Sequence, residues 1–309
     1  ARQRDGQADQ DRAYPLDPLV FDELAAEAKE NSGQSVSTNK KTMVLHESEV
    51  QSMKLLQYLF LEDLYIVGCR RIADDVELPS VDRKKRYHYL LPTINYWYAD
   101  PFLYEKDGKV YVFVEAYNLW LAKGAIGVAL FEKEKFSRVK LVLEKDFHMS
   151  YPNVFELNGN IYMIPETCAR HQIQLYEATN FPYKWSLKKV LVDGIDAVDT
   201  SILITHDGSL FLYTKENCAG GKVLWFKLGE DFSILPVDVP GMAQERPGGN
   251  PLYINNDILR PLQDGKACYG HRVLLYQSIN KNNSDIGREA LAQIVDTNCF
   301  FNLPHRKYK

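Results

Sequence analysis

Carboxylates at the ends of short strand-like segments are the residues of this chain best suited to chemistry. Asp100 stands at the start of ADPFLYE, and Glu115 ends the segment KVYVFVE that follows it. The Asp-Gly pair at 107–108, between two apolar runs, predicts a tight hairpin turn. In a hairpin the start of the first strand and the end of the second lie together. Both carboxylates are therefore expected at one end of the hairpin.

This hairpin pattern returns three more times along the chain. The four units are 99–117, 150–167, 198–216 and 248–264. They open on Asp100, Tyr151, Asp199 and Asn250, at intervals of about 50 residues. The turn chemistry also returns, because Asn-Gly stands at 158–159 and Asp-Gly at 207–208. A long period of this kind indicates a repeat architecture.

Two further strand candidates follow each hairpin. They are 124–132 and 139–147, 171–179 and 185–194, 222–229 and 232–240, and 271–279 and 289–297. Four antiparallel strands that recur about every 50 residues are typical of a β-propeller blade. The pattern predicts an all-β protein, a five-bladed propeller with four-stranded blades. A β-sandwich with accidental internal similarity is the alternative.

The predicted domain organisation is a leader followed by the propeller. Residues 1–45 are polar and predict a flexible leader, with the propeller over 46–309. Smaller elements are expected at 18–30 and 47–61 (helices), 64–73 (a strand) and 74–93 (a loop). Propellers often close by a strand from the N-terminal part, so 64–73 is expected to complete the fifth blade with the C-terminal segment. The tail from 299 is short for three more strands, so this blade could be incomplete.

The acids are expected at one mouth of the propeller, because the first strand of each blade lies nearest the axis. Glu115 and Glu166 stand at the same distance past their turn glycines, which places them at equivalent points of two blades. Glycoside hydrolysis needs a proton donor and a base or nucleophile, and both are usually carboxylic acids. The candidate catalytic residues are Asp100, Glu115, Glu166 and Asp199. The alternative is that these acids accept hydrogen bonds from strand-start amides.

Other polar and aromatic side chains near the same mouth could contact a substrate. These candidate substrate-binding residues are Trp97, His148, Tyr151, Arg246, Arg260 and Asp264. An arginine could hold a carboxylate or phosphate through two hydrogen bonds, or pair with one of the acids. Trp97 could stack on a sugar ring or pack in the core. His148 could reach the mouth or lie on a surface loop.

Composition excludes several classes of protein. The chain is 45% hydrophobic and 25% charged with a net charge of −4, which is typical of a globular protein and argues against nucleic-acid binding. No apolar run is long enough for a transmembrane segment. The five cysteines are widely separated and show no zinc spacing. The sequence therefore predicts no metal, no cofactor and no membrane span.

Several segments together resemble a known family. ADPFLYEKDGKVYVFVE, KGAIGVALFE, SYPNVFELNGNIYMIPET, LYEATNFPYKW and AVDTSIL look like the five-bladed propeller of family-43-like glycosyl hydrolases. They are more closely similar to the variant that forms the N-terminal domain of glucosamine inositolphosphorylceramide transferase and related bacterial proteins. The similarity covers roughly residues 60–295.

The resemblance implies a funnel-shaped carbohydrate site. Family-43 hydrolases use an aspartate of blade one as base, a second aspartate that modulates pKa, and a glutamate as acid. Asp100 matches the first, whereas Tyr151 stands at the equivalent position of blade two and Asp199 at that of blade three. Glu166 is the best match to the acid, with Glu115 as the alternative.

The function implied is a carbohydrate-active propeller acting on a glycan or glycoconjugate. It would work as a glycosidase-like or a glycosyltransferase-associated enzyme. The alternative is a non-catalytic module that binds a glycan and positions it for a partner glycosyltransferase domain.

Overall fold

The computed structural model describes residues 65–70, 86–254, 257–265, 272–278 and 289–295. The predicted leader and the two predicted helices lie outside these residues. Within these ranges, no helix combines the length and the apolar character that a membrane crossing requires.

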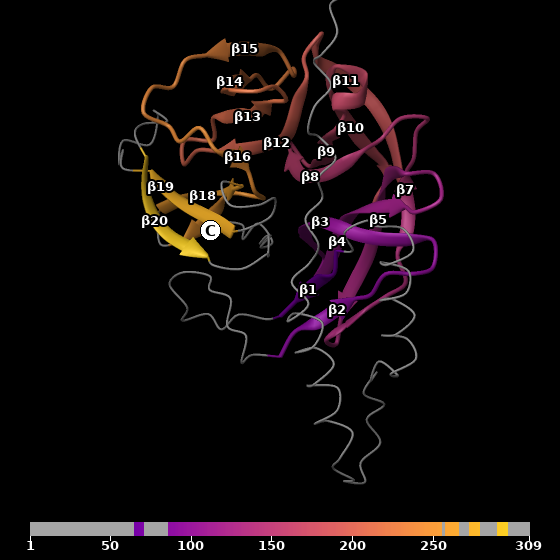
Figure 1. The fold of residues 1–309 in the computed structure, drawn as a ribbon. Helices are drawn as coiled ribbons and strands as arrows, with labels where there is room; N and C mark the ends of the chain where they lie inside the picture. The colour runs from indigo at the N-terminus through magenta and orange to yellow at the C-terminus, as the bar shows by residue number, and fades with distance from the viewer. Residues whose placement is uncertain (1–64, 71–85, 255–256, 266–271, 279–288, 296–309) are drawn as a thin grey trace, which may run out of the picture. The chain divides into compact units, whose positions relative to one another are not determined.

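The described residues form four antiparallel sheets of four or five strands in chain order, coloured from purple to yellow in Figure 1, and a separate two-stranded sheet. Blade one contains β3 (Tyr96–Lys106), β4 (Lys109–Asn118), β5 (Lys123–Glu132), β6 (Lys135–Phe136) and β7 (Lys140–Leu143). Blade two contains β8 (Ser150–Leu157), β9 (Asn160–Glu166), β10 (Gln172–Asn180) and β11 (Lys184–Asp193), with the short 3-10 helix η1 (Cys168–Arg170) between β9 and β10.

Blade three contains β12 (Ala197–Ile204), β13 (Leu210–Glu216), β14 (Val223–Leu228) and β15 (Ile234–Val237). Blade four contains β16 (Arg246–Pro247), β17 (Leu252–Ile254), β18 (Asp257–Asp264), β19 (Arg272–Ser278) and β20 (Glu289–Val295). The prediction of an all-β chain built from repeated blades is confirmed.

The hairpin turns form where the sequence predicts them. Asp107 and Gly108 have φ of 52° and 70°, and Asn158 and Gly159 have φ of 50° and 77°. A two-residue hairpin turn needs positive φ at both central residues, which Asn, Asp and Gly tolerate best. Turn chemistry therefore favours the register that β3 forms with β4 and β8 with β9 next to the turn.

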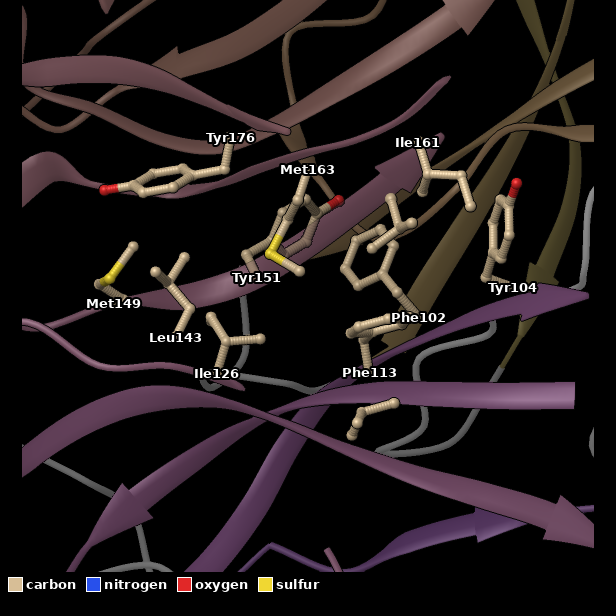
Figure 2. Close-up of a cluster of buried hydrophobic side chains, with 12 residues drawn as sticks. Phe102, Tyr104, Phe113, Ile126, Leu143, Met149, Tyr151, Ile161, Met163 and Tyr176 are labelled. Atoms are coloured by element: carbon tan, nitrogen blue, oxygen red, sulfur yellow. The ribbon is translucent and has the colours of Figure 1, made fainter. Parts of the chain in front are cut away.

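Each blade packs against the next through alternating faces of its strands. In β9, Ile161 and Met163 face blade one, whereas Tyr162 and Ile164 face blade three. Figure 2 shows the first of these cores, with Phe102, Phe113 and Ile126 of blade one among its members. The hydrophobic cores at these seams between blades consist mainly of aromatic and branched side chains that are less than a tenth exposed. Burial of these side chains holds the blades together.

The first strands of successive blades contact one another, as β3 with β8, β8 with β12, and β12 with β16. A hydrogen bond of 2.9 Å from Asn153 Nδ2 to Asn250 Oδ1 joins blade two directly to blade four. These first strands therefore lie nearest the axis, as expected.

The predicted fifth blade is not established by the residues that the structure describes. β1 (Val67–Cys69) lies within the predicted strand, but its partner is β2 (His88–Leu90) in a separate two-stranded sheet. The prediction of a loop throughout 74–93 was therefore wrong at β2. Val67 and Leu90 pack on the face of blade one opposite blade two, where a fifth blade would lie.

Candidate functional site

The first three blades share a bulge near the start of their inner strand. In blade one the pairing passes from Ala99–Glu115 to Phe102–Phe113, which leaves one extra residue on β3. The same irregularity occurs in β8 and β12. Asp100, Tyr151 and Asp199 lie within these bulges with φ of 46°, 46° and 54°. Left-handed backbone at non-glycine residues is costly, and it is concentrated at functional sites.

The bulges of blades two and three are each tied to the preceding blade by one acid. Asp100 Oδ2 accepts a hydrogen bond from the Tyr151 backbone N–H at 3.2 Å. Glu166 Oε2 accepts one from the Asp199 backbone N–H at 3.1 Å. The alternative to a catalytic role that the sequence leaves open is that the acids accept hydrogen bonds from strand-start amides. One oxygen of Asp100 and one oxygen of Glu166 accept such a bond.

Asp199 is engaged by blade four. The Arg246 guanidinium donates to both carboxylate oxygens, through Nε to Oδ2 and through Nη2 to Oδ1 at 3.0 Å. Gln263 Nε2 donates to Oδ2 at 2.6 Å. Arg246 Nη2 also lies 3.6 Å from Glu166 Oε2. Arg246 thus neutralises Asp199 inside the protein. Of the two roles expected for an arginine here, holding an anionic ligand or pairing with one of the acids, the structure shows the second.

Glu115 is buried beside His148, whose Nε2 lies 3.5 Å from Glu115 Oε1. The Gly124 backbone N–H donates to His148 Nδ1 at 3.0 Å. Nδ1 is therefore unprotonated, and the neutral ring carries its hydrogen on Nε2, toward Glu115. A Cβ on Gly124 would lie 2.5 Å from Glu115 Oε1 and from the Met149 carbonyl oxygen. Only glycine allows this approach.

Three acids of this cluster, Asp100, Glu115 and Glu166, have raised pKa values. Burial, followed by the negative charge of Asp199, raises the pKa of Asp100 to about 7 and that of Glu166 to about 8. Burial, followed by the charge of Asp100, raises the pKa of Glu115 well above its usual value. Asp100 and Glu166 keep some solvent-exposed surface, whereas Glu115 and Asp199 are buried. Asp100 and Glu166 are thus the two accessible acids of the cluster.

Tyr151 lies in the expected bulge, but its side chain is buried and links the blades. Its hydroxyl lies 2.8 Å from Ser201 Oγ of blade three and accepts from the Gly249 backbone N–H at 2.7 Å. Its ring meets Phe102 of blade one edge-on, with centroids 4.7 Å apart. Trp97 is also buried and stacks on Tyr117 at 4.6 Å. Both side chains serve packing in the structure.

Arg260 and Asp264 are buried and contact other side chains of blades three and four. Arg260 is fully buried, with its guanidinium carbon 4.6 Å from the Tyr213 ring centroid and 4.7 Å from that of Trp225. Asp264 accepts a hydrogen bond from Arg272 Nε at 2.7 Å. Adjacent side chains of a strand point to opposite faces, so Gln263, which reaches Asp199, and its neighbour Asp264 lie on different faces of β18.

The sequence reading missed Ser201 as a member of this network. A signal for Ser201 exists, because Phe102, Asn153 and Ser201 stand two residues after the bulge residue in three blades. All three side chains are at most 1% exposed, so the position two residues after the bulge residue is buried in each of these blades. Among the described residues, no group of three or more His, Cys, Asp or Glu side chains is arranged to hold a metal ion.

Comparison with known proteins shows to which family the chain belongs. Residues 91–290 match the family described as glucosamine inositolphosphorylceramide transferase 1, N-terminal. The chain belongs to this family. The resemblance seen in the repeated hairpins is therefore confirmed.

Plant members of the family show how much of a relative the chain represents. It is 31% identical over 193 residues to glucosamine inositolphosphorylceramide transferase 1 of Oryza sativa subsp. indica, covering 58% of this chain and 26% of that protein. The Arabidopsis thaliana protein of the same name is 30% identical over 189 residues, covering 57% and 24%. The chain thus spans about a quarter of the length of these relatives.

Solved structures with a similar fold include a β-xylosidase and a family-43 enzyme. The RS223 β-xylosidase aligns with a TM-score of 0.50 and 13% identity, over 65% of this chain and 79% of that one. A GH43_1 enzyme from Xanthomonas citri aligns with a TM-score of 0.50 and 14% identity, over 65% and 75%. At these identities the likeness supports the propeller fold and nothing finer.

Proposed function

We propose that this chain is a carbohydrate-active propeller whose glycan or glycoconjugate site is centred on Asp100 and Glu166. The observation that carries the proposal is that these are the two accessible acids in a cluster of four, and that burial and the charge of Asp199 raise the pKa of both. The family fold and the relatives' name, a glucosamine inositolphosphorylceramide transferase, support a glycan as ligand. A partner glycosyltransferase domain belongs to the same proposal.

The proposed chemistry assigns different roles to the two acids. With a pKa near 8, Glu166 is mostly protonated at neutral pH and can donate a proton to a leaving oxygen. With a pKa near 7, Asp100 is ionised in about half of the molecules there and can act as the base. Pairs of acids whose environments separate their pKa values commonly divide the work in this way. Hydrolysis or transfer should therefore be fastest between about pH 7 and 8.

A second candidate is a non-catalytic module that binds a glycan and positions it for a transferase. It is favoured by the Asp199–Arg246 pair, because Asp199 is buried and already neutralised by two hydrogen bonds. Tyr151 also stands where family-43 hydrolases have an acid. In this candidate, Asp100 and Glu166 hold sugar hydroxyls and transfer no proton.

Turnover of aryl glycosides and sugar nucleotides, measured beside glycan-array binding, tests both candidates. In the catalytic case Asp100→Asn and Glu166→Gln each lower turnover by about a hundredfold or more but leave binding largely intact. The control is Glu105→Gln, an exposed acid at the other end of β3, which should change neither. Binding without turnover that is lost in Asp100→Asn supports the module. The absence of both from the wild-type protein rules out a glycan site here.

A further inference from the structure

A second site lies outside the acid cluster, at the outer part of the seam between blades one and two. A pocket of about 530 Å³ is lined by 145–147, 169–172, Gln174, Tyr176 and two apolar residues of β11. This volume is within the range of small-molecule sites. We propose that this pocket binds a sugar-sized anion, a monosaccharide unit that carries a carboxylate or a phosphate.

Two cations give the pocket its charge. The Arg170 guanidinium carbon lies 5.1 Å from the Phe147 ring centroid, and Lys145 Nζ lies 5.8 Å from that of Tyr176. In the part of the chain that the structure describes, neither cation has a carboxylate within ion-pair distance. A guanidinium held on an aromatic face keeps its N–H edge available for an anion. Arg170 is thus positioned for a ligand before one arrives.

The floor of the pocket is polar and ordered. Tyr176 OH donates to Gln174 Oε1 at 2.6 Å, and Gln174 Nε2 donates to Gln172 Oε1 at 2.6 Å. Gln172 Nε2 in turn donates to Asp193 Oδ1 at 2.8 Å. Figure 2 shows the Tyr176 hydroxyl pointing away from the hydrophobic cluster that its ring borders. This relay fixes the Tyr176 proton beneath the pocket, where that side chain is 1% exposed, and Gln172, which keeps some exposed surface, presents the relay to a sugar hydroxyl.

Among the residues that line the pocket the two cations outnumber the acids, and Asp193 stands beyond the lining, where it accepts a hydrogen bond from Gln172. His171 is paired with Asp196, so this pair adds no net charge when the histidine is protonated. Asp146 is exposed and is the one acid among the residues that line the pocket. The lining therefore favours an anion, whereas the acid cluster around Asp100 would repel one. Carboxylate and phosphate are the groups that Arg and Lys recognise, and the amide–phenol relay suits hydroxyls.

Titration calorimetry of the full chain with glucuronate, glucose 1-phosphate and glucose tests the proposal. We expect at least one of the two anions to bind, and glucose to bind at least tenfold more weakly than that anion. The tighter anion shows whether carboxylate or phosphate is preferred. Binding should weaken as salt is added, because the attraction is electrostatic.

Matched variants locate the binding. Arg170→Gln and Lys145→Gln should each weaken anion binding about tenfold or more, since each removes a charge-assisted contact. Arg138→Gln, at an exposed arginine outside the pocket, should leave it unchanged. Asp100→Asn should also leave it unchanged, which separates this site from the acid cluster. Glucose binding as tight as the anions, no anion binding, or equal affinity in Arg170→Gln and wild type would overturn the proposal.

Discussion

At the scale of single residues, the acid cluster divides into one charged pair and three acids that resist ionisation. Arg246 holds Asp199 through two hydrogen bonds, so one negative charge is compensated. Burial and that same charge raise the pKa of Asp100 and Glu166, because a second uncompensated charge would cost more. The Gly124 contact keeps Glu115 beside a neutral His148. The site therefore carries titratable protons near neutral pH.

This arrangement predicts how stability depends on pH. Folded Glu166 has a pKa near 8 and the unfolded residue one near 4.5, so between these values the folded state binds the extra proton. The free energy of unfolding should therefore fall as pH rises through this window. Glu166→Gln, which cannot ionise, should equal wild type near pH 5. At pH 9 it should be more stable by about 1 kcal/mol or more, or about 2–4 °C in Tm.

Thermal unfolding from pH 5 to 9 checks this expectation. Glu105→Gln is the control, since Glu105 is exposed and lies far along β3 from the cluster. A Glu166→Gln variant that loses stability at pH 9 relative to wild type would show that the folded protein favours the ionised carboxylate, which contradicts a raised pKa for Glu166.

At the scale of elements, blade one is covered on both faces. Blade two covers one face, and the β1–β2 sheet covers the other with Val67 and Leu90, which are 5% and 6% exposed. Two short strands are enough to cover this face of blade one, because the apolar side chains of Val112 and Val114 in β4 pack in the same cluster as Val67 and Leu90. The sheet thus protects β4, the strand that carries Glu115.

Truncation of this contact should be costly. Leu90→Ala removes a buried side chain and should destabilise the protein by about 2–4 kcal/mol in urea unfolding. Leu141→Ala is a matched control, because Leu141 is 38% exposed, and its cost should stay below about 1 kcal/mol. Equal costs for the two variants would mean that the β1–β2 sheet adds little to blade one.

At the scale of the whole propeller, Tyr151 connects all four described blades. Its backbone N–H reaches Asp100, its ring meets Phe102, and its hydroxyl reaches Ser201 and Gly249. Because the side chain is buried, these contacts lie in a medium where an unpaired polar group is expensive. Polar contacts at the axis therefore fix the blades relative to one another, while the apolar seams supply most of the burial.

Tyr151→Phe should destabilise the protein by about 1–3 kcal/mol, because it leaves Ser201 and the Gly249 N–H without this partner. Ser201→Ala should cost less in the Tyr151→Phe background than in wild type, and a double-mutant cycle measures the difference. Tyr183→Phe, at a tyrosine that is 48% exposed, should be near neutral. Additive costs for Tyr151 and Ser201 would show that the two hydroxyls act independently.

The sequence by itself determined the repeated blade, its strands and its turns, and it brought Asp100 and Glu115 to one end of the first hairpin. These features follow from local physics, since side-chain alternation and turn residues act over a few neighbours. Only the tertiary structure decided that Arg246 neutralises Asp199, that Tyr151 joins the blades, and that Arg260 is buried between Tyr213 and Trp225. Those pairings join residues of different strands or blades, and the packing of whole sheets selects them.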